Sequence, residues 1–447
     1  MTLGHRLAQL DNTNRATGNG ARRPRPRGPV DELRDRAKDS LLKDISKKMG
    51  GPERSPEQLR RLVTSELNRL IDESNGLLTE EERERVATMV IDDVLGYGPI
   101  EPLLADPEVS EVMVNGTDSI YVERNGMIEL TRIRFRTEDH LKQIIVRIAA
   151  AMGRRIDESS PMVDARLADG SRVNAVIPPL AVDGPVLTIR KFAAETLTAD
   201  ELVRKGSLSA PAMNLLAVCV RGRLNIMVSG GTGTGKTTFL NVLSGFIPAS
   251  DRVVTIEDAV ELQLRQRHVI RLECRPANIE GRGEVGTRDL VRNSLRMRPD
   301  RIIIGECRGA EALDMLQAMN TGHEGSLGTL HANSPEDALA RLETMVLMTG
   351  VELPARAIRE QIASALDLIV QLERLRNGAR VVTSITEVVG LSDGELVLSD
   401  LFLRRFEEGP DLVSVLEPLD VQPQFTPKLA KHGEVLDTEQ RSPRTGQ

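Results

Sequence analysis

Residues 224–246 read LNIMVSGGTGTGKTTFLNVLSGF: an apolar stretch, a glycine-rich turn and an amphipathic stretch, in that order. Gly230 to Thr237 match the pattern G-x-x-x-x-G-K-[ST], and the flanks are the strand and the helix that this motif requires. Glycines allow the backbone to curl so that successive N–H groups point at phosphate oxygens, and the helix N-terminus adds its dipole. A glycine-rich turn without a ligand is the alternative, and the two flanks make it the less favoured one. The stretch therefore predicts a phosphate-binding loop within an α/β domain.

Two side chains of this loop carry the chemistry of nucleotide binding. Lys236 is expected to reach the β- and γ-phosphates, and the Thr237 hydroxyl is expected to bind Mg²⁺. Between Lys205 and Lys428 the chain contains no other lysine, although arginine is frequent there. This usage favours a compact ammonium group that must fit inside a phosphate-binding loop. The predicted nucleotide-binding residues are Gly230, Gly231, Thr232, Gly233, Thr234, Gly235, Lys236, Thr237 and Thr238.

Downstream of the loop, apolar stretches alternate with polar ones, as in a parallel sheet with helical crossovers. Two apolar stretches, RVVTIEDAVEL at 252–262 and RPDRIIIGECRGAE at 298–311, contain carboxylates at their ends. Strand C-terminal ends face the ligand crevice of an open α/β sheet, so Glu257 and Glu306 are expected near the phosphates. Hydrolysis needs an acid that holds Mg²⁺ and an acid that activates water, and position at a strand end does not rank the two. Two further acids, Asp258 and Glu261, lie near the end of the first of these stretches. Capping of a following helix explains them at least as well as a chemical role does.

Before the loop, the chain is predicted to combine helices with short strands. Apolar residues at helical spacing predict helices at 31–49, 56–73 and 79–95, the last with the acidic start TEEERER. An Asn-Gly pair at 125–126 then predicts a hairpin turn. The predicted elements around it are strands at 111–116, 120–126, 127–130, 172–178 and 186–192, with a helix at 138–152.

Composition bounds the classes of protein. With 447 residues, of which 40% are apolar and 28% charged, the chain is expected to form two or more domains. No apolar run reaches bilayer length, the first residues lack a signal-peptide core, and three separated cysteines indicate neither disulfides nor a cysteine zinc site. A cytoplasmic protein is therefore predicted. Residues 1–30, rich in arginine, are expected to be a solvated tail. Aromatic residues make up only 2% of the chain, so nucleic-acid binding by base stacking is not expected.

The series GGTGTGKTT, TIEDAVE and RPDRIIIGECRGAEALDMLQAMNTGHEGSLGTLHANS resembles the Walker A motif, Asp box, Walker B motif and His box of secretion-superfamily ATPases. The resemblance is greatest to the CpaF/TadA branch, the motors of tight-adherence (Flp) pili. It covers about 95–405, including LGYGPIEPLL and DARLADGSRVNAVIPPL. Two departures within the superfamily matter. It lacks the tetracysteine zinc insertion of type II secretion ATPases, and its Walker B strand ends in Gly305-Glu306 instead of the common aspartate.

The resemblance implies an α/β fold. It consists of an N-terminal helical module and an α+β, PAS-like sensor domain, followed by a RecA-like P-loop NTPase domain with a mainly parallel sheet, in subunits that form a hexameric ring. ATP would lie between the sensor-like and RecA-like domains, with Mg²⁺. The predicted parts are a disordered basic tail (1–30), a helical module (31–95), an α+β ATPase subdomain (96–195), a linker (196–206), the RecA-like domain (207–420) and a disordered tail (421–447).

The stretch TGHEGSLGTLHANS, 321–334, contains two of the six histidines, His323 and His331. They do not form H-E-x-x-H, because position 327 is leucine, and no third ligand lies nearby, so a zinc site is not expected. A pair of loop histidines without a role is the alternative from the residues alone. The family's His box implies that they sense the γ-phosphate and contact a neighbouring subunit. The glycines between them predict a loop that moves between nucleotide states.

Arginines of the N-terminal domain are expected to complete the site. Arg172 in GSRVNAV and Arg190 in LTIRKF resemble the family arginines that approach the phosphates, and a planar guanidinium suits the charge that develops on phosphoryl oxygens. A surface ion pair is the alternative for any arginine of an arginine-rich chain. The weaker candidates are Arg166, Arg221 and Arg308.

Three functions are compatible with these residues. The favoured one is an ATPase motor that powers assembly, or also retraction, of a tight-adherence pilus at the inner face of the cytoplasmic membrane, with polytopic membrane platform proteins as partners. A type IV secretion ATPase for DNA or effector export is the alternative within the same fold. A nucleotide-gated scaffold with little turnover is the alternative from another class, and the intact pair of carboxylates argues against it.

Overall fold

The computed structural model describes residues 79–192, 197–275, 277, 282–406 and 414–436, together with positions 61, 64, 65, 68 and 69. The predicted basic tail at 1–30 and the predicted helix at 31–49 lie outside these residues. The chain separates into two compact units, Met1–Asp106 with Ile133–Ile148 and Pro107–Arg132 with Ala149–Gln447.

The first unit is helical in its described part. Its elements are α4 (Glu80–Leu95), the 3₁₀ helix η1 (Gly98–Ile100), α5 (Glu101–Ala105) and most of α6 (Glu138–Ala151). A capping box begins α4, because the Thr79 hydroxyl accepts the Glu82 N–H and the Glu82 carboxylate accepts the Thr79 N–H at 2.8 Å. The helices predicted at 79–95 and 138–152 are confirmed.

The second unit begins with a six-stranded antiparallel sheet in the order β3-β2-β1-β6-β5-β4. Its strands are β1 (Val109–Asn115), β2 (Ser119–Arg124), β3 (Met127–Leu130), β4 (Met162–Arg166), β5 (Arg172–Val176) and β6 (Val186–Arg190). Asn125 and Gly126 join β2 to β3, both with positive φ, as the Asn-Gly pair predicts. The five predicted strands are confirmed, and β4 is a strand that the sequence did not predict.

A nine-stranded sheet follows, in the order β15-β14-β13-β12-β7-β11-β10-β8-β9. Neighbours from β12 to β9 pair in parallel, and β13 to β15 extend the sheet in antiparallel fashion. The strands are β7 (Ile226–Gly230), β8 (Val253–Glu257), β9 (Val269–Glu273), β10 (Arg301–Cys307), β11 (Leu327–Leu330), β12 (Leu368–Arg374), β13 (Arg380–Ser392), β14 (Glu395–Phe406) and β15 (Ser414–Pro418). The helices are α7 (Ala199–Arg204), α8 (Ala210–Arg221), α9 (Lys236–Ser244), α10 (Thr287–Ser294), α11 (Glu311–Asn320), α12 (Pro335–Leu347), α13 (Ala355–Ala365) and α14 (Thr426–Lys431). A mixed α/β fold is thus confirmed.

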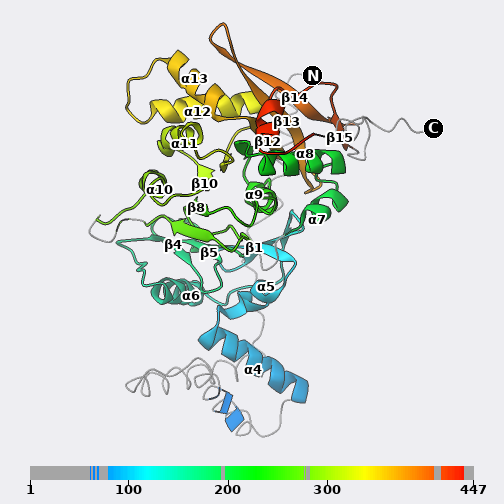
Figure 1. Ribbon diagram of the computed structural model, residues 1–447. Coiled ribbons are helices and arrows are strands. Elements are labelled where there is room, and N and C mark those ends of the chain that lie inside the picture. The colour runs from blue at the N-terminus through cyan, green and yellow to red at the C-terminus, as the bar shows by residue number, and fades with distance from the viewer. Residues whose placement is uncertain are drawn as a thin grey trace, which may run out of the picture. The chain divides into compact units, whose positions relative to one another are not determined.

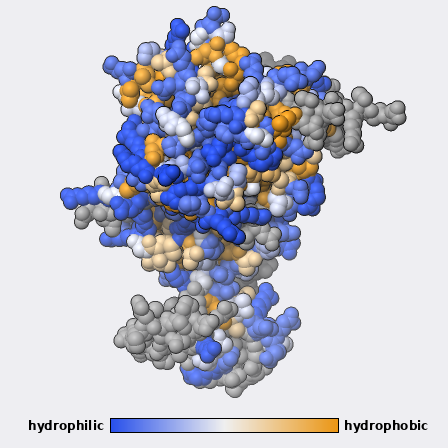
Figure 2. Space-filling model, in the orientation of Figure 1, coloured by the Kyte–Doolittle hydropathy of each residue, from blue (hydrophilic) through white to orange (hydrophobic). Residues whose placement is uncertain are grey.

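Helices cover both faces of this sheet, so its central strands are apolar on both sides. In β7, Ile226 and Val228 belong to the core that packs against α8 and α9, whereas Met227 between them belongs to the core that packs against α11, α12 and α13. Figure 1 shows these two groups of helices on opposite sides of the strands. Hydrophilic residues cover most of the face shown in Figure 2, as expected when apolar residues enter two cores. Within the described ranges, every helix is too short or too polar to cross a lipid bilayer.

Residues 327–330 differ from the predicted mobile glycine loop. They form β11, which is buried along its length and pairs with β7 on one side and β10 on the other. Gly328 is one of these buried residues. A short glycine-containing strand resembles a loop in sequence, so the predicted loop is wrong for 327–330, whereas movement of the residues on either side of the strand stays a prediction.

Residues 421–436 differ from the predicted disordered tail. They include α14, and the side chains of Phe425 and Leu429 are buried in the core beside α8 and α9. The buried Glu387 carboxylate accepts the backbone N–H groups of Gln424 at 2.8 Å and of Phe425 at 2.9 Å. Two buried apolar side chains, one buried acceptor and the ion pair of Lys428 with Asp367 at 2.7 Å therefore contribute to docking this mostly polar segment.

Candidate functional site

The P-loop joins the C-terminal end of β7 to the N-terminal end of α9. Gly233 and Gly235 have φ values of +72° and +89°, which explains the need for glycine at both positions. A Cβ on Gly230 would lie 2.5 Å from the Leu372 carbonyl oxygen of β12, so this position has no room for a side chain. The predicted strand, glycine turn and helix are all present.

Lys236 is buried within this loop. Its Nζ donates hydrogen bonds to the carbonyl oxygens of Gly230 and Gly231, each at 2.8 Å, and lies 3.4 Å from Nε2 of His331. Burial lowers the pKa of Lys236 to about 8, and the carboxylate of Glu306 partly opposes this change. The ammonium group is therefore held at the loop backbone, close to the end of β11.

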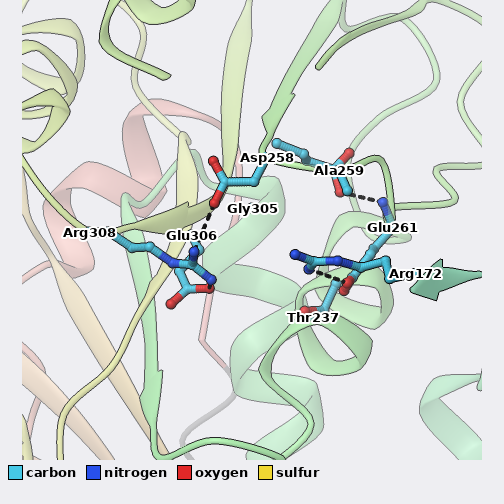
Figure 3. A pocket seen from close by; sticks show the side chains of 9 residues that line it. Arg172, Thr237, Asp258, Ala259, Glu261, Gly305, Glu306 and Arg308 are labelled. Carbon is cyan, nitrogen blue, oxygen red and sulfur yellow. Dashed lines mark hydrogen bonds and ion pairs between the residues drawn. The ribbon is translucent and has the colours of Figure 1, made fainter. Parts of the chain in front are cut away.

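The ends of three parallel strands form one pocket beside the loop. β7, β8 and β10 run in the same direction, so the P-loop and the two predicted acids meet at one edge of the sheet. Figure 3 shows Arg172 and Thr237 on one side of the pocket and Glu306 and Arg308 on the other. The residues that line it are Arg172, Thr237, Glu257, Asp258, Ala259, Glu261, Gly305, Glu306 and Arg308.

Glu257 is the more enclosed of the two acids, with 3% of its surface exposed. Its Oε2 accepts the backbone N–H groups of Glu261 at 2.7 Å and Leu262 at 2.9 Å, whereas its Oε1 has no hydrogen-bond partner among the described residues. Burial raises the pKa of Glu257, and the two backbone donors oppose this only in part. A Cβ on Gly305 would lie 2.9 Å from Glu257 Cγ, so the glycine of Gly305-Glu306 leaves space for this side chain.

Glu306 is surrounded by cations. Its Oε2 accepts from Arg308 at 2.6 Å, and its Oε1 lies 2.8 Å from His331 Nε2. Burial disfavours the ionised form, but the charges of Arg308, His331 and Lys236 outweigh it and lower the pKa of Glu306. This carboxylate is therefore kept ionised near neutral pH.

The pocket fits a hard divalent cation. The Thr237 hydroxyl, the Glu306 carboxylate and the Oε1 of Glu257, which accepts no hydrogen bond from the described residues, supply oxygen atoms, which Mg²⁺ prefers. Thr237 and Glu306 would hold Mg²⁺ together with a nucleotide, the latter through water. Mg²⁺ would neutralise phosphate charge in that complex.

The two histidines of 321–334 lie beyond opposite ends of the central strand β11. His331 follows the C-terminal end of β11 and contacts Glu306 and Lys236, and burial together with the Lys236 charge lowers its pKa. His323 precedes the N-terminal end of β11, where its carbonyl accepts the Ser326 hydroxyl at 2.8 Å. Of the two histidines, only His331 therefore contacts a residue that lines the pocket, namely Glu306.

The two predicted arginines lie on neighbouring strands, in register with each other. Arg172 begins β5, lines the pocket and pairs with Glu261 at 3.1 Å. Arg190 ends β6, and its side chain makes no hydrogen bond or ion pair with any residue that the structure describes. Burial is the main cause of the lowered pKa of Lys236, and the positive charge of Arg190 adds to it.

The weaker arginine candidates divide. Arg308 lies in the pocket and bridges Glu306 and Asp258, at 2.6 Å and 3.0 Å. The other two pair outside the pocket, Arg166 with Glu273 at 2.8 Å and Arg221 with Glu434 at 2.9 Å.

One cation at the P-loop was not anticipated. Arg380, at the start of β13, donates from Nε to the Gly233 carbonyl oxygen at 2.9 Å. The sequence RLRNGARVV at 374–382, with Asn-Gly between two apolar strands, carries the signal of a hairpin. It carries no signal that this hairpin lies beside a loop about 140 residues earlier.

Comparisons with known proteins identify the family of this chain. The family described as "Type II/IV secretion system protein" matches residues 93–389. A Mycobacterium tuberculosis protein named provisionally for conjugal transfer is 40% identical over 299 residues, which cover 66% of this chain and 84% of that protein. The type IV secretion system protein PtlH of Bordetella pertussis is 36% identical over 303 residues, covering 62% and 88%. The solved structure of the VirB11 ATPase from the Brucella suis type IV secretion system is similar with 29% identity and a TM-score of 0.36, covering 64% and 91%. The family match includes every residue of the pocket.

Proposed function

Because this chain belongs to the type II/IV secretion system protein family, we propose that it is an ATPase motor of a secretion or pilus-assembly machine. It hydrolyses ATP with Mg²⁺ and transmits the energy to membrane components of that machine. The observation that carries the proposal is the pocket in which Thr237 of the P-loop faces the strand-end acids Glu257 and Glu306. Phosphate release by the purified chain with ATP and Mg²⁺ tests it, and an absence of release would favour the nucleotide-gated scaffold.

The proposal assigns different work to the two acids. Glu257 has a raised pKa and an Oε1 that no described residue contacts by a hydrogen bond, which suits a general base that accepts a proton from the attacking water. Glu306 is ionised and lies among cations, which suits water-mediated binding of Mg²⁺. His331 contacts both Glu306 and Lys236, so it is suited to sense the γ-phosphate.

Arg172 and Arg190 are proposed to act on catalysis more than on nucleotide binding. Arg172→Ala or Arg190→Ala is expected to lower kcat by about 10²-fold or more, because a guanidinium stabilises charge that develops during phosphoryl transfer. The affinity for ATP is expected to change little, since the P-loop still holds the phosphates. Equilibrium binding of ATP and single-turnover hydrolysis measure the two effects separately.

Arg221→Ala is the matched control for Arg172→Ala. Arg221 is similarly exposed, 40% against 43%, and is also in one salt bridge to a glutamate, but it lies outside the pocket. It is expected to retain kcat. A stable Arg172→Ala variant with unchanged kcat would show that this residue only pairs with Glu261.

We propose that the subunits form a closed ring of six, as the resemblance to secretion motors implies. A ring requires a heterologous interface whose rotation closes, and the resemblance implies that a neighbouring subunit contacts the site. Light scattering at micromolar protein is expected to give the mass of six 49.1 kDa chains in the presence of ATP and Mg²⁺. Full ATPase activity in a monomer would contradict the ring.

Among machines, we propose a tight-adherence pilus, with the chain at the inner face of the cytoplasmic membrane and polytopic platform proteins as partners. The resemblance of the four motifs to the CpaF/TadA branch supports this choice. Export of DNA or effectors by a type IV secretion system is the second candidate, and it is favoured by the names of the two relatives. Removing the gene from its host separates them: loss of surface pili supports the first, and loss of transfer with intact pili supports the second.

A further inference from the structure

Two Asn-Gly turns, one from each sheet of the second unit, meet back to back. Gly126 lies in the turn between β2 and β3, and Gly378 lies in the turn between β12 and β13. A Cβ on Gly126 would be 2.6 Å from the Gly378 carbonyl oxygen, and a Cβ on Gly378 would be 3.1 Å from the Gly126 carbonyl oxygen. The backbones of the two hairpins are therefore in direct contact, with no space for a side chain between them.

A buried carboxylate lies beside this contact. Glu123 of β2 is 7% exposed, and no function above uses it. Its Oε1 accepts from Arg380 Nη2 at 2.7 Å and from the Ser110 hydroxyl at 3.1 Å, and its Oε2 pairs with Arg374 Nη1 at 3.2 Å. Arg374 also donates to the Gly126 carbonyl. One acid of the six-stranded sheet thus holds two arginines of the β12–β13 hairpin.

Both arginines reach the P-loop. Arg380 donates from Nε to the Gly233 carbonyl oxygen at 2.9 Å, and its Cδ lies 3.2 Å from where a Cβ of Gly235 would be. Arg374 Nη1 lies 3.2 Å from where a Cβ of Gly233 would be. Gly233 and Gly235 both have positive φ, so the arginines contact a part of the loop with little intrinsic conformational preference.

We infer that Glu123 is a positioning residue for the P-loop, acting through Arg380. The peptide bond is planar, so fixing the Gly233 carbonyl also fixes the direction of the Thr234 N–H. Loops of this kind bind phosphates through the direction of their N–H groups. The inference deepens the proposed function, because it makes nucleotide affinity depend on contact between the six-stranded sheet and the loop. Movement of that sheet would then change how tightly the nucleotide is held.

The test removes the negative charge of the Glu123 side chain and keeps the shape of that side chain. Glu123→Gln is expected to weaken binding of a fluorescent ATP analogue, with Mg²⁺ and the full chain, by about tenfold, the effect of one charge-assisted hydrogen bond. The single-turnover rate at saturating ATP is expected to stay within about threefold, because Glu257 and Glu306 keep their contacts. A change in affinity without a change in rate is an effect that general loss of stability would not produce.

Two further variants trace the path of the effect. Arg380→Gln is expected to weaken binding similarly, and the double variant with Glu123→Gln is expected to be no weaker than either single variant, since both break one chain of contacts. Glu273→Gln is the matched control. It breaks the pair with Arg166, which also joins the six-stranded sheet to the nine-stranded one but does not reach the P-loop. The affinity of Glu273→Gln for the ATP analogue is expected to equal that of the wild type.

The outcomes separate this inference from the proposed function. Wild-type affinity in a folded Glu123→Gln variant, or additive effects in the double variant, would overturn the inference and leave the ATPase proposal intact. A wild-type chain that binds no ATP would overturn the ATPase proposal itself. Thermal unfolding without nucleotide checks each variant for folding. Should Glu123→Gln unfold, Arg380→Lys decides: it keeps a charge for Glu123 but removes the Nε–H that Gly233 accepts, so binding is expected to weaken, and unchanged binding would overturn the inference.

Discussion

Lys236→Ala is expected to abolish ATP turnover, with phosphate release falling by at least about 10³-fold. The Nζ of Lys236 is buried against the Gly230 and Gly231 carbonyl oxygens, at the point where a P-loop receives the β- and γ-phosphates. The ammonium group is therefore in place before any rearrangement of the loop. Alanine removes the positive charge that would balance the phosphates.

A surface lysine provides the control for this variant. Lys205, which ends α7, is exposed and lies outside the pocket, so Lys205→Ala is expected to retain full turnover. Phosphate release is measured for both variants at the same ATP and Mg²⁺ concentrations. Undiminished release from Lys236→Ala would mean that the site has been placed wrongly.

Glu257→Gln is expected to retain ATP binding and to lose turnover by about 10²- to 10⁴-fold, the range for removal of a general base. Glutamine has the same shape and can keep an acceptor for the N–H groups of Glu261 and Leu262, so the structure of the strand end is preserved. What is lost is the carboxylate oxygen that has no partner among the described residues.

Glu306→Gln is the paired comparison. Glu306→Gln is expected to weaken the binding of Mg²⁺ more than Glu257→Gln does. Loss of binding in Glu257→Gln with retained binding in Glu306→Gln would reverse the two roles. The pH profile gives an independent check. Since burial raises the pKa of Glu257 above its ordinary value of 4.5, kcat should fall on acidification at a pH above 4.5. If Glu306 were the base, its lowered pKa would place that fall below 4.5.

The sequence predicted the parts of the site whose signals are local. The P-loop, its strand and its helix lie within 23 consecutive residues. The motif is recognisable because its glycines, lysine and threonine recur at fixed spacing between a strand and a helix. Glu257 and Glu306 could be predicted because a parallel sheet brings strand ends to one edge wherever the strands lie in the chain. The family resemblance was confirmed by the family match, and the mixed α/β class by the structure.

The remaining parts depend on contacts distant in sequence, which composition and periodicity do not encode. His323 and His331 were treated as a pair because they are eight residues apart, but four buried residues between them form β11 and separate them by the height of the sheet. Glu123 and Arg380 form an ion pair across 257 positions, and nothing in either local sequence marks it. The segment that contains α14 is held in part by the buried Glu387 carboxylate, and the sequence near residue 424 does not indicate this contact.

The strand that carries the P-loop has a consequence for the order in which the chain can fold. β7 pairs with β11 and β12, which begin about 100 and about 140 residues later, and with no strand that precedes it. Closing segments of this length costs chain entropy before any contact is made, so strand pairing of this kind is slow. During synthesis, residues 226–236 therefore emerge long before their neighbours exist. A chain that stopped before residue 368 would contain the complete motif and would lack the strand whose Leu372 carbonyl packs against Gly230.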